Sequence, residues 1–123
     1  MIIGHGIDIV DLTRFQNMKS DRLLRLAFRI CTDSELSEFK NNNVKYKYLA
    51  KIWAVKESVS KAFGTGIRGD TTWKNIEVRS STLGQPQIYL KPPLHKPKLF
   101  YHTSVSHDGD YLIASTILEF NDC

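Results

Sequence analysis

The feature that most constrains the fold is the stretch from about Val44 to Phe63, which predicts one long helix in a chain of 123 residues. Gly64 follows it directly, in the position where a glycine commonly ends a helix. Alanines and large apolar residues occupy much of the stretch, so we expect the helix to pack into a core. Glu57 and Lys61 nevertheless lie one turn apart near its end, just before a glycine-containing loop. Their place in the helix raises the question of whether its end belongs to a site.

Shorter elements are predicted before this helix. Alternation and many isoleucines predict a first strand, and Asp11 after it is a residue that can cap a helix N-terminus. Thr32 and Glu35 have the spacing of a capping box, which predicts the start of another helix. The predicted elements are a strand at 2–10, a helix from near Leu12, a helix at 21–30 and a short helix that ends in the asparagines at 41–43.

Strands are predicted after the long helix. Segments 75–81 and 87–90 flank a turn marked by Gly84, and two further strands flank a hairpin turn at Asp108 and Gly109. A proline-rich connector occupies 91–98. Because helices come first and strands last, we expect a single α+β domain over 1–123, with a small antiparallel sheet packed on the long helix.

Composition narrows the class of protein. The formal net charge of +4 and pI of about 9.1 are compatible with nucleic acid, an anionic cofactor or an acidic protein as partner. No apolar run approaches the ~20 residues of a membrane span, and the first residues lack the features of a signal peptide. Cys31 and Cys123 form neither a disulfide framework nor a zinc site. We therefore expect a cytoplasmic protein that has no membrane contact.

Charged residues suggest a site, although each has a simpler interpretation. Glu57 and Lys61 at i and i+4 would form a surface ion pair worth ~0.3–0.5 kcal/mol. Ala50 and Ala54 on the same side instead favour the close approach of another group. Asp8, in the first strand, faces either solvent or the helix, and with Glu57 it would supply two oxygen ligands for Mg²⁺. The spacing alone does not show that the two carboxylates meet.

The glycines and the histidine carry weaker signals. Gly64, Gly66 and Gly69 match G-x-G-x-x-G, but a helix precedes them, which excludes a dinucleotide fingerprint. The loop is either a site where backbone N–H groups approach an anion or a flexible turn. His107 cannot form a triad with its neighbours Ser106 and Asp108, because strand side chains alternate between faces. A structural hydrogen bond is the simpler role for this histidine.

Basic residues also form a stripe on the second predicted helix. Arg22, Arg25 and Arg29 fall at i, i+3 and i+7, and Arg14 lies upstream. The stripe is either a solvated face or a surface for phosphates or an acidic partner helix. No aromatic ladder accompanies it, which argues against single-stranded nucleic acid.

Four stretches resemble the holo-acyl-carrier-protein synthase family, the small 4′-phosphopantetheinyl transferases. They are "GIDIVDLTRF" at 6–15, "RICTDSEL" at 29–36, "AVKESVSKAFGTGI" at 54–67 and "SVSHD" at 104–108. The resemblance implies the family's fold and the transfer of phosphopantetheine from coenzyme A to a serine of apo-acyl carrier protein. Adenosine 3′,5′-bisphosphate would be the second product, and a homotrimer with sites between protomers is implied.

The resemblance also implies roles for individual residues. Asp8 and Glu57 would hold Mg²⁺, Lys61 would contact the phosphates and stabilise the leaving group, and His107 would lie near the pyrophosphate. We expect a carboxylate-bound water as the general base. The implied coenzyme A contacts are Ser60, Lys61, Gly64, Gly66, Pro86 and His107. The implied carrier-binding residues are Arg14, Arg22, Arg25 and Arg29, with Arg14 foremost.

One departure from the family pattern concerns the coenzyme. Many relatives have "GRFAAKE", where this chain has Lys51 and Ile52 at the start of "KIWAVKE". The arginine is absent at Ile52, and Lys51 is a candidate to replace it. A basic nucleic-acid-binding module and a non-catalytic adaptor for an acidic protein remain as alternatives; the first predicts affinity that falls steeply with salt.

Overall fold

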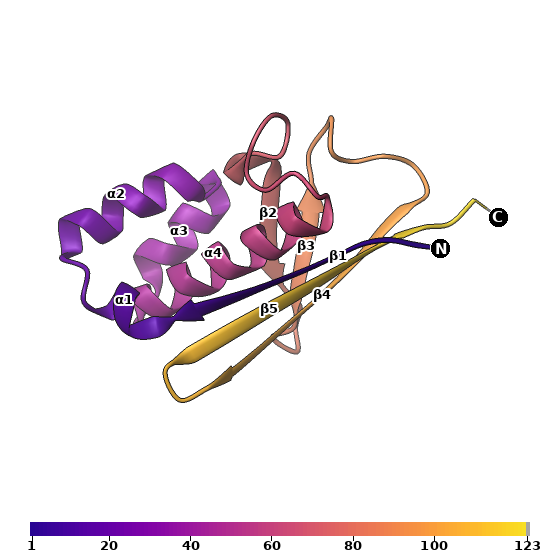
Figure 1. Ribbon diagram of the computed structural model, residues 1–123. Helices are drawn as coiled ribbons and strands as arrows, with labels where there is room; N and C mark the ends of the chain where they lie inside the picture. Colours follow the sequence, from indigo (N-terminus) through magenta and orange to yellow (C-terminus); the bar gives the residue numbers. More distant parts are fainter. Residues whose placement is uncertain (123) are drawn as a thin grey trace.

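The computed structural model describes residues 1–122, and its helices precede most of its strands as predicted (Figure 1). Cys123 lies outside the described residues, and Cys31 is a buried free thiol. No helix among the described residues is long and apolar enough to cross a membrane. The elements are β1 (Ile2–Asp11), α1 (Leu12–Gln16), α2 (Ser20–Ile30), α3 (Asp33–Asn41), α4 (Lys45–Ala62), the 3₁₀ helix η1 (Trp73–Asn75), β2 (Ile76–Ser80), β3 (Pro86–Leu90), β4 (Leu99–Asp108) and β5 (Tyr111–Phe120).

Local sequence signals account for the helix ends. The Asp11 side chain accepts a hydrogen bond from Thr13 N at 3.0 Å, and the capping box of Thr32 and Glu35 is formed. At the end of α4, Gly64 has φ of +80° and donates its N–H to the Lys61 carbonyl at 2.9 Å. The predicted caps and the predicted glycine stop are therefore confirmed.

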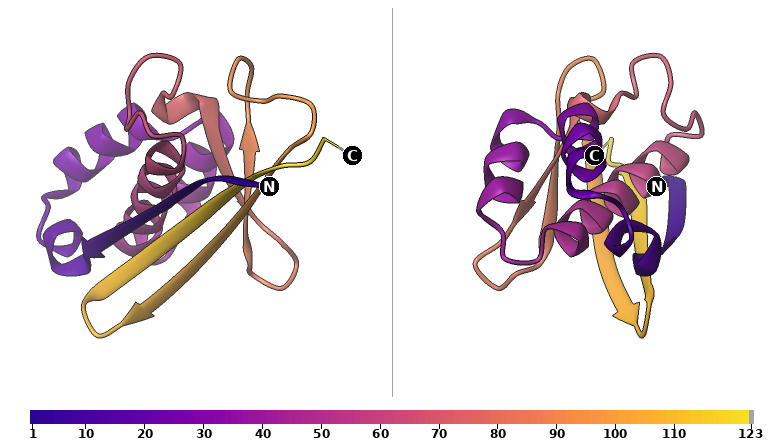
Figure 2. Two further views of the ribbon diagram at one scale, coloured as in Figure 1. Left: turned by 45° about the vertical axis from the view of Figure 1, so that its right-hand side comes forward. Right: turned by 90° about the vertical axis from the view of Figure 1, so that its left-hand side faces the viewer.

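The strands form two antiparallel sheets. One has the order β1-β5-β4, and the other is the hairpin of β2 and β3. α4 lies along one face of the larger sheet, mainly against β1 and β5, and the other helices lie beyond it (Figures 1 and 2). The predicted α+β class, with a small antiparallel sheet packed on a long helix, is confirmed.

Two glycines bring β1 close to α4. A Cβ at Gly4 would overlap the Ala62 carbonyl, and a Cβ at Gly6 would overlap the Ser58 carbonyl. Because only hydrogen fits at these positions, the strand approaches the helix backbone directly. This close approach determines which side chains of β1 meet the last turns of α4.

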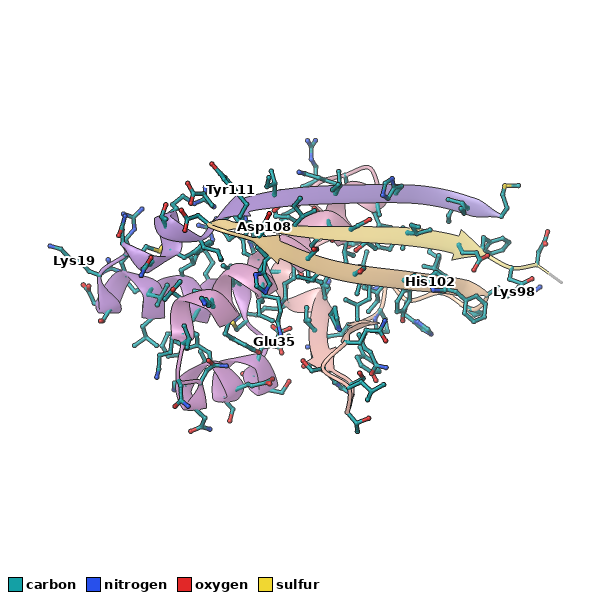
Figure 3. The ribbon with its side chains drawn as sticks, turned by 90° about the horizontal axis from the view of Figure 1, so that it is seen from below. Lys19, Glu35, Lys98, His102, Asp108 and Tyr111 are labelled. Atoms are coloured by element: carbon teal, nitrogen blue, oxygen red, sulfur yellow. The ribbon has the colours of Figure 1, made fainter. Side chains whose placement is uncertain are left out.

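The two faces of the larger sheet differ. Alternate residues of β1 and β5 point toward α4 and are buried or partly buried, whereas the opposite face is open to solvent. Figure 3 shows His102 toward one end of this sheet and Asp108 and Tyr111 at the β4–β5 turn at the other. Large apolar side chains remain exposed on the open face, namely Ile3, Ile7, Ile9, Phe100 and Ile113.

Candidate active site

Asp8 and Lys61 meet where β1 crosses the last turns of α4. The Lys61 Nζ lies 2.9 Å from Oδ1 of Asp8 and donates a hydrogen bond to the Ile7 carbonyl at 3.0 Å. The Asp8 side chain is 13% exposed and the Lys61 side chain 48%. Asp8 therefore faces the helix and not the solvent.

Glu57 lies one turn before Lys61 on the same helix and is half-buried. Burial raises the pKa of its carboxyl, the charge of Asp8 raises it further, and Lys61 opposes the shift. Of the two interpretations, the simple surface ion pair of Glu57 with Lys61 is not formed, because the ammonium pairs with Asp8 across the helix–strand contact. The result is two neighbouring carboxylates with one cation between helix and strand.

The donor set fits a hard cation such as Mg²⁺. Oδ2 of Asp8 is buried and has no hydrogen-bond partner among the described residues, so one carboxylate oxygen is left for an external ligand. Nowhere in residues 1–122 do three histidine, cysteine, aspartate or glutamate side chains gather as a ready-made metal cage. Two carboxylates, completed by water and substrate phosphates, are the usual protein share for Mg²⁺.

The opening that Ala50 and Ala54 suggested is filled by the protein itself. Both alanines are completely buried, so they bring α4 against its own neighbours and leave no room for a ligand. The glycine loop, in contrast, is open. Gly64 and Gly66 have positive φ, and an added Cβ would meet nothing within 4 Å at either position. Free space therefore adjoins the end of α4.

Ser60 lies within this end of the helix and is buried. Its hydroxyl donates to the Glu57 carbonyl at 2.7 Å, and its own carbonyl accepts from Gly66 N at 3.2 Å. The Ser60 side chain thus stabilises the turn that contains Glu57, and its carbonyl connects the helix to the glycine loop.

His107 lies in a separate depression. It shares a rung of the larger sheet with Val10 and Leu112, and it lines a cavity of about 500 Å³ together with Lys47 and Lys51. Asp8, Glu57 and Lys61 do not line this cavity. Sequence reasoning missed Lys47, although its i, i+4 spacing from Lys51 places both on one side of α4.

The structure places Lys51 and Ile52, where the chain departs from the family pattern, in different environments. Ile52 is 1% exposed and belongs to the core, whereas Lys51 reaches the cavity that contains His107. Lys47 and Lys51 are thus the basic residues of α4 that line this cavity.

Pro86 lies at the start of β3. It lines another depression, of about 550 Å³, between the β2–β3 hairpin and β4. Tyr89, His95 and Tyr101 also line it. One chain thus distributes the predicted coenzyme residues over separate surfaces, with Asp8, Glu57, Lys61 and the glycine loop at one of them.

The arginine stripe is a real surface feature. Arg14, Arg22, Arg25 and Arg29 all line one depression of about 710 Å³ beside α1, α2 and α4. Its floor is apolar, with Phe15, Met18, Leu26 and Trp53 among the lining residues. The Arg14 guanidinium lies over the Phe15 and Trp53 rings, 5.2 and 5.7 Å from their centroids. An apolar floor under a cationic rim fits an amphipathic acidic helix better than a bare phosphate chain.

Comparisons with known proteins agree with the resemblance noted in the sequence. Residues 4–116 match the family profile of the 4′-phosphopantetheinyl transferase superfamily. A holo-[acyl-carrier-protein] synthase of Streptococcus equi subsp. zooepidemicus is 43% identical over 121 residues, which cover 97% of this chain and 98% of that protein.

Solved structures show the same fold. The crystal structure of a holo-[acyl-carrier-protein] synthase from Neisseria meningitidis has a TM-score of 0.84 and 34% identity, covering 97% of this chain and 99% of that one. A holo-(acyl-carrier-protein) synthase from Bacillus anthracis, solved in complex with CoA (3′,5′-ADP), has a TM-score of 0.83 and 32% identity, covering 98% and 99%.

Proposed function

Because this chain belongs to the 4′-phosphopantetheinyl transferase superfamily, we propose that it is a holo-acyl-carrier-protein synthase. It transfers 4′-phosphopantetheine from coenzyme A to a serine hydroxyl of apo-acyl carrier protein. The serine oxygen forms a bond to the β-phosphorus, and the bond from that phosphorus to the bridging oxygen breaks. Adenosine 3′,5′-bisphosphate leaves with the electron pair. The observation that carries the proposal is the meeting of Asp8, Glu57 and Lys61 beside an open glycine loop.

Each residue of this group has a role that suits phosphoryl transfer, which depends mainly on positioning and charge neutralisation. Asp8 and Glu57 would hold Mg²⁺, which when bound neutralises charge on the pyrophosphate. Lys61, half-exposed at the end of α4, can turn its ammonium from Asp8 toward the leaving phosphate. Water held by the Glu57 carboxylate would take the proton of the serine hydroxyl.

Coenzyme A would also need the two other depressions. Lys47, Lys51 and His107 supply cations and a hydrogen-bonding ring for its phosphates, and Pro86 lines the other depression. Because one chain keeps these surfaces apart from Asp8, we propose that a neighbouring copy completes the site in a homotrimer. The exposed apolar face of the larger sheet, with Ile7 and Phe100, offers the area for such an interface.

The carrier protein would dock on the arginine-lined depression. Acyl carrier proteins are acidic, so Arg14, Arg22, Arg25 and Arg29 would steer and orient them, while the apolar floor receives a helix face. This role uses the positive charge without requiring a nucleic acid.

The test is to incubate the protein with coenzyme A, Mg²⁺ and an apo-acyl carrier protein, and to weigh the carrier by mass spectrometry. We expect the mass of one phosphopantetheine to be added only when metal is present and Glu57 is intact. Glu57→Gln, with its almost unchanged shape, is the matched variant. An unchanged carrier, together with no coenzyme A binding in calorimetry, would contradict the proposal and leave the adaptor interpretation.

A further inference from the structure

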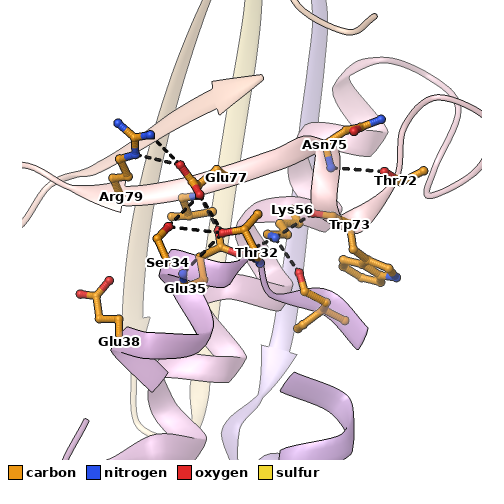
Figure 4. Close-up of polar contacts among 12 residues, drawn as sticks. Thr32, Ser34, Glu35, Glu38, Lys56, Thr72, Trp73, Asn75, Glu77 and Arg79 are labelled. Atoms are coloured by element: carbon orange, nitrogen blue, oxygen red, sulfur yellow. Dashed lines mark hydrogen bonds and ion pairs between the residues drawn. The ribbon is translucent and has the colours of Figure 1, made fainter. Parts of the chain in front are cut away.

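Lys56, the neighbour of Glu57, points away from the site and is completely buried. Its ammonium donates three hydrogen bonds, to Oε1 of Glu35 at 2.6 Å, to the Ile30 carbonyl at 2.6 Å and to the Trp73 carbonyl at 2.7 Å (Figure 4). An ammonium has three N–H donors, so every one of them has an acceptor. The acceptors come from three other elements, α2, α3 and η1.

Glu35 extends the contact to a further element. Its Oε1 also accepts from Thr32 N at 2.8 Å, and its Oε2 accepts from Val78 N in β2 at 2.6 Å. Because Val78 lies in the β2–β3 hairpin, the Lys56–Glu35 pair connects α4 to the hairpin that carries Pro86. Neither side chain is exposed at all.

The Lys56 ammonium also holds the far end of the glycine loop. The loop, residues 63–72, leaves α4 one residue after Ala62 and enters η1 at Trp73. Lys56 belongs to α4, and its ammonium holds the carbonyl of Trp73. The loop has bonds of its own, from Thr71 N to the Arg68 carbonyl at 3.0 Å and from Thr65 Oγ1 to Thr71 Oγ1 at 3.0 Å, and Gly66 N ties it to the Ser60 carbonyl of α4 at 3.2 Å. One side chain of α4 therefore anchors the residue at which the loop enters η1.

A buried ion pair is a poor way to gain stability alone. Removing two charges from water costs several kcal/mol per ion, and apolar side chains of similar size often stabilise a core as well or better. Burial lowers the pKa of Lys56, while Glu35 opposes that shift. The pair instead gives the elements that it joins a defined geometry, since hydrogen bonds fix distances and angles that apolar contacts leave adjustable.

We propose that Lys56 is a positioning residue for coenzyme A: through Glu35 and Trp73 it holds the glycine loop and the β2–β3 hairpin at the places where the coenzyme binds. The inference rests on the proposed function, because it assigns the coenzyme to these two elements. Lys56 touches neither the carboxylates nor the reacting atoms, and it acts through the backbone that it anchors.

The test compares Lys56→Met with Lys45→Met, the same substitution at an exposed lysine in the first turn of α4. In Lys56→Met we expect KM for coenzyme A to rise at least tenfold while KM for the carrier stays within about twofold. Hydrogen–deuterium exchange should become faster in residues 64–72 and in the hairpin, and stay unchanged in β1 and β5. Lys45→Met should match the wild type in every measurement.

Other outcomes would overturn the proposal. If Lys56→Met melts at a lower temperature but keeps both KM values and the loop exchange of the wild type, the pair serves stability only. If Lys56→Met does not fold, the double variant Lys56→Met, Glu35→Gln, which leaves no unpaired buried charge, is judged by the same criteria. If the wild type transfers no phosphopantetheine, the proposed function fails, and loop exchange alone decides: faster exchange supports the anchor, and unchanged exchange contradicts it.

Discussion

At the scale of the residue, Gly6 matters because it has no side chain. A Cβ there would overlap the Ser58 carbonyl and come within 2.5 Å of Ala62 N, both in the backbone of α4. Backbone atoms cannot rotate away as a side-chain tip can, so the strand and the helix would have to separate. Asp8 and Lys61 lie on either side of this same contact, and any separation would lengthen their 2.9 Å ion pair.

We therefore predict that Gly6→Ala affects both folding and activity. Overpacking should cost ~1–3 kcal/mol of unfolding free energy, and displacement of Asp8 from the end of α4 should lower kcat about a hundredfold. Thermal melting and the transfer assay measure the two effects. His5→Ala, at the outward-facing neighbour, is the control and should keep wild-type kcat; a fully active Gly6→Ala would show that the helix can shift without harm.

Glu57 gives a prediction with opposite signs for activity and stability. Burial and Asp8 raise the pKa of Glu57 above its ordinary value of 4.5, so the folded protein holds this proton more tightly than the unfolded chain. The contribution of Glu57 to the free energy of unfolding therefore falls as the pH rises from 4.5 through the raised pKa of the folded protein. Glu57→Gln should melt at the same or a higher temperature than wild type at pH 7, and the gain should vanish below pH 4.5.

Activity should change in the other direction, because the carboxylate must be ionised to hold a cation. We expect Glu57→Gln to lose on the order of a hundredfold or more in kcat at pH 7. The wild-type rate should fall as pH is lowered through the raised pKa of Glu57. A variant that melts earlier at pH 7, or a rate that does not change as the pH is lowered to 4.5, would contradict the environment assigned to this residue.

At the scale of the element, α1 and α2 present cations over an apolar floor. Arg14 is the arginine of this set that lies over aromatic rings, so its guanidinium is held in place before a partner arrives. The exposed pair of Arg25 with Asp21, at 4.0 Å, is too long and too solvated to hold Arg25 in the same way.

Arg14→Ala should consequently weaken the binding of the carrier protein and leave the binding of coenzyme A unchanged. We predict about a tenfold rise in KM for the carrier protein, a smaller dependence of that KM on salt, and an unchanged KM for coenzyme A. Lys40→Ala removes the same charge from α3 and should leave both constants unchanged. Equal effects of the two variants would mean that net charge, not this depression, attracts the carrier.

At the scale of the whole molecule, the residues proposed for the site lie on surfaces that one chain does not bring together. His107 lies with Lys47 and Lys51, whereas Glu57 lies with Asp8 and Lys61. The proposed trimer resolves this division if each site takes Glu57 from one copy and His107 from the next.

Mixing two inactive variants tests this arrangement. Co-expressed Glu57→Gln and His107→Ala chains should recover roughly a quarter of wild-type activity, because random assembly gives that share of sites both intact residues. Each variant alone should stay near its own low rate. If both residues of a site came from one copy, the mixture would show only the average of the two variants.

The sequence predicted those parts of the molecule that depend on neighbours along the chain. The caps at Asp11 and Thr32 and the stop at Gly64 need only a few residues, and all were found. Contacts across the chain were harder. The pattern cannot choose between solvent and helix for Asp8, or between a surface ion pair and a site for Lys61. Both depend on the close approach of β1 and α4 at Gly6, which local sequence does not show.

The sequence also does not show which side chains of a helix are buried. From the sequence alone, Ala50 and Ala54 favour the close approach of another group to the helix, yet both pack inside the protein. Lys56 carries no local sign that it faces inward, since its partners at Glu35 and Trp73 come from other elements. A charged residue in a helix is exposed by default, and only its three short hydrogen bonds show the exception.

The ion pair of Lys61 with Asp8 has a consequence for the order of events. In the free protein the positive charge of Lys61 offsets part of the repulsion between the neighbouring carboxylates of Asp8 and Glu57. A divalent ion arriving alone at Oδ2 of Asp8 would be repelled by that ammonium, which already pairs with Oδ1 of the same carboxylate. An ion arriving already bound to the coenzyme offers the ammonium a phosphate as its new partner. The metal and coenzyme A should thus enter as one complex, and free Mg²⁺ should bind only weakly before it.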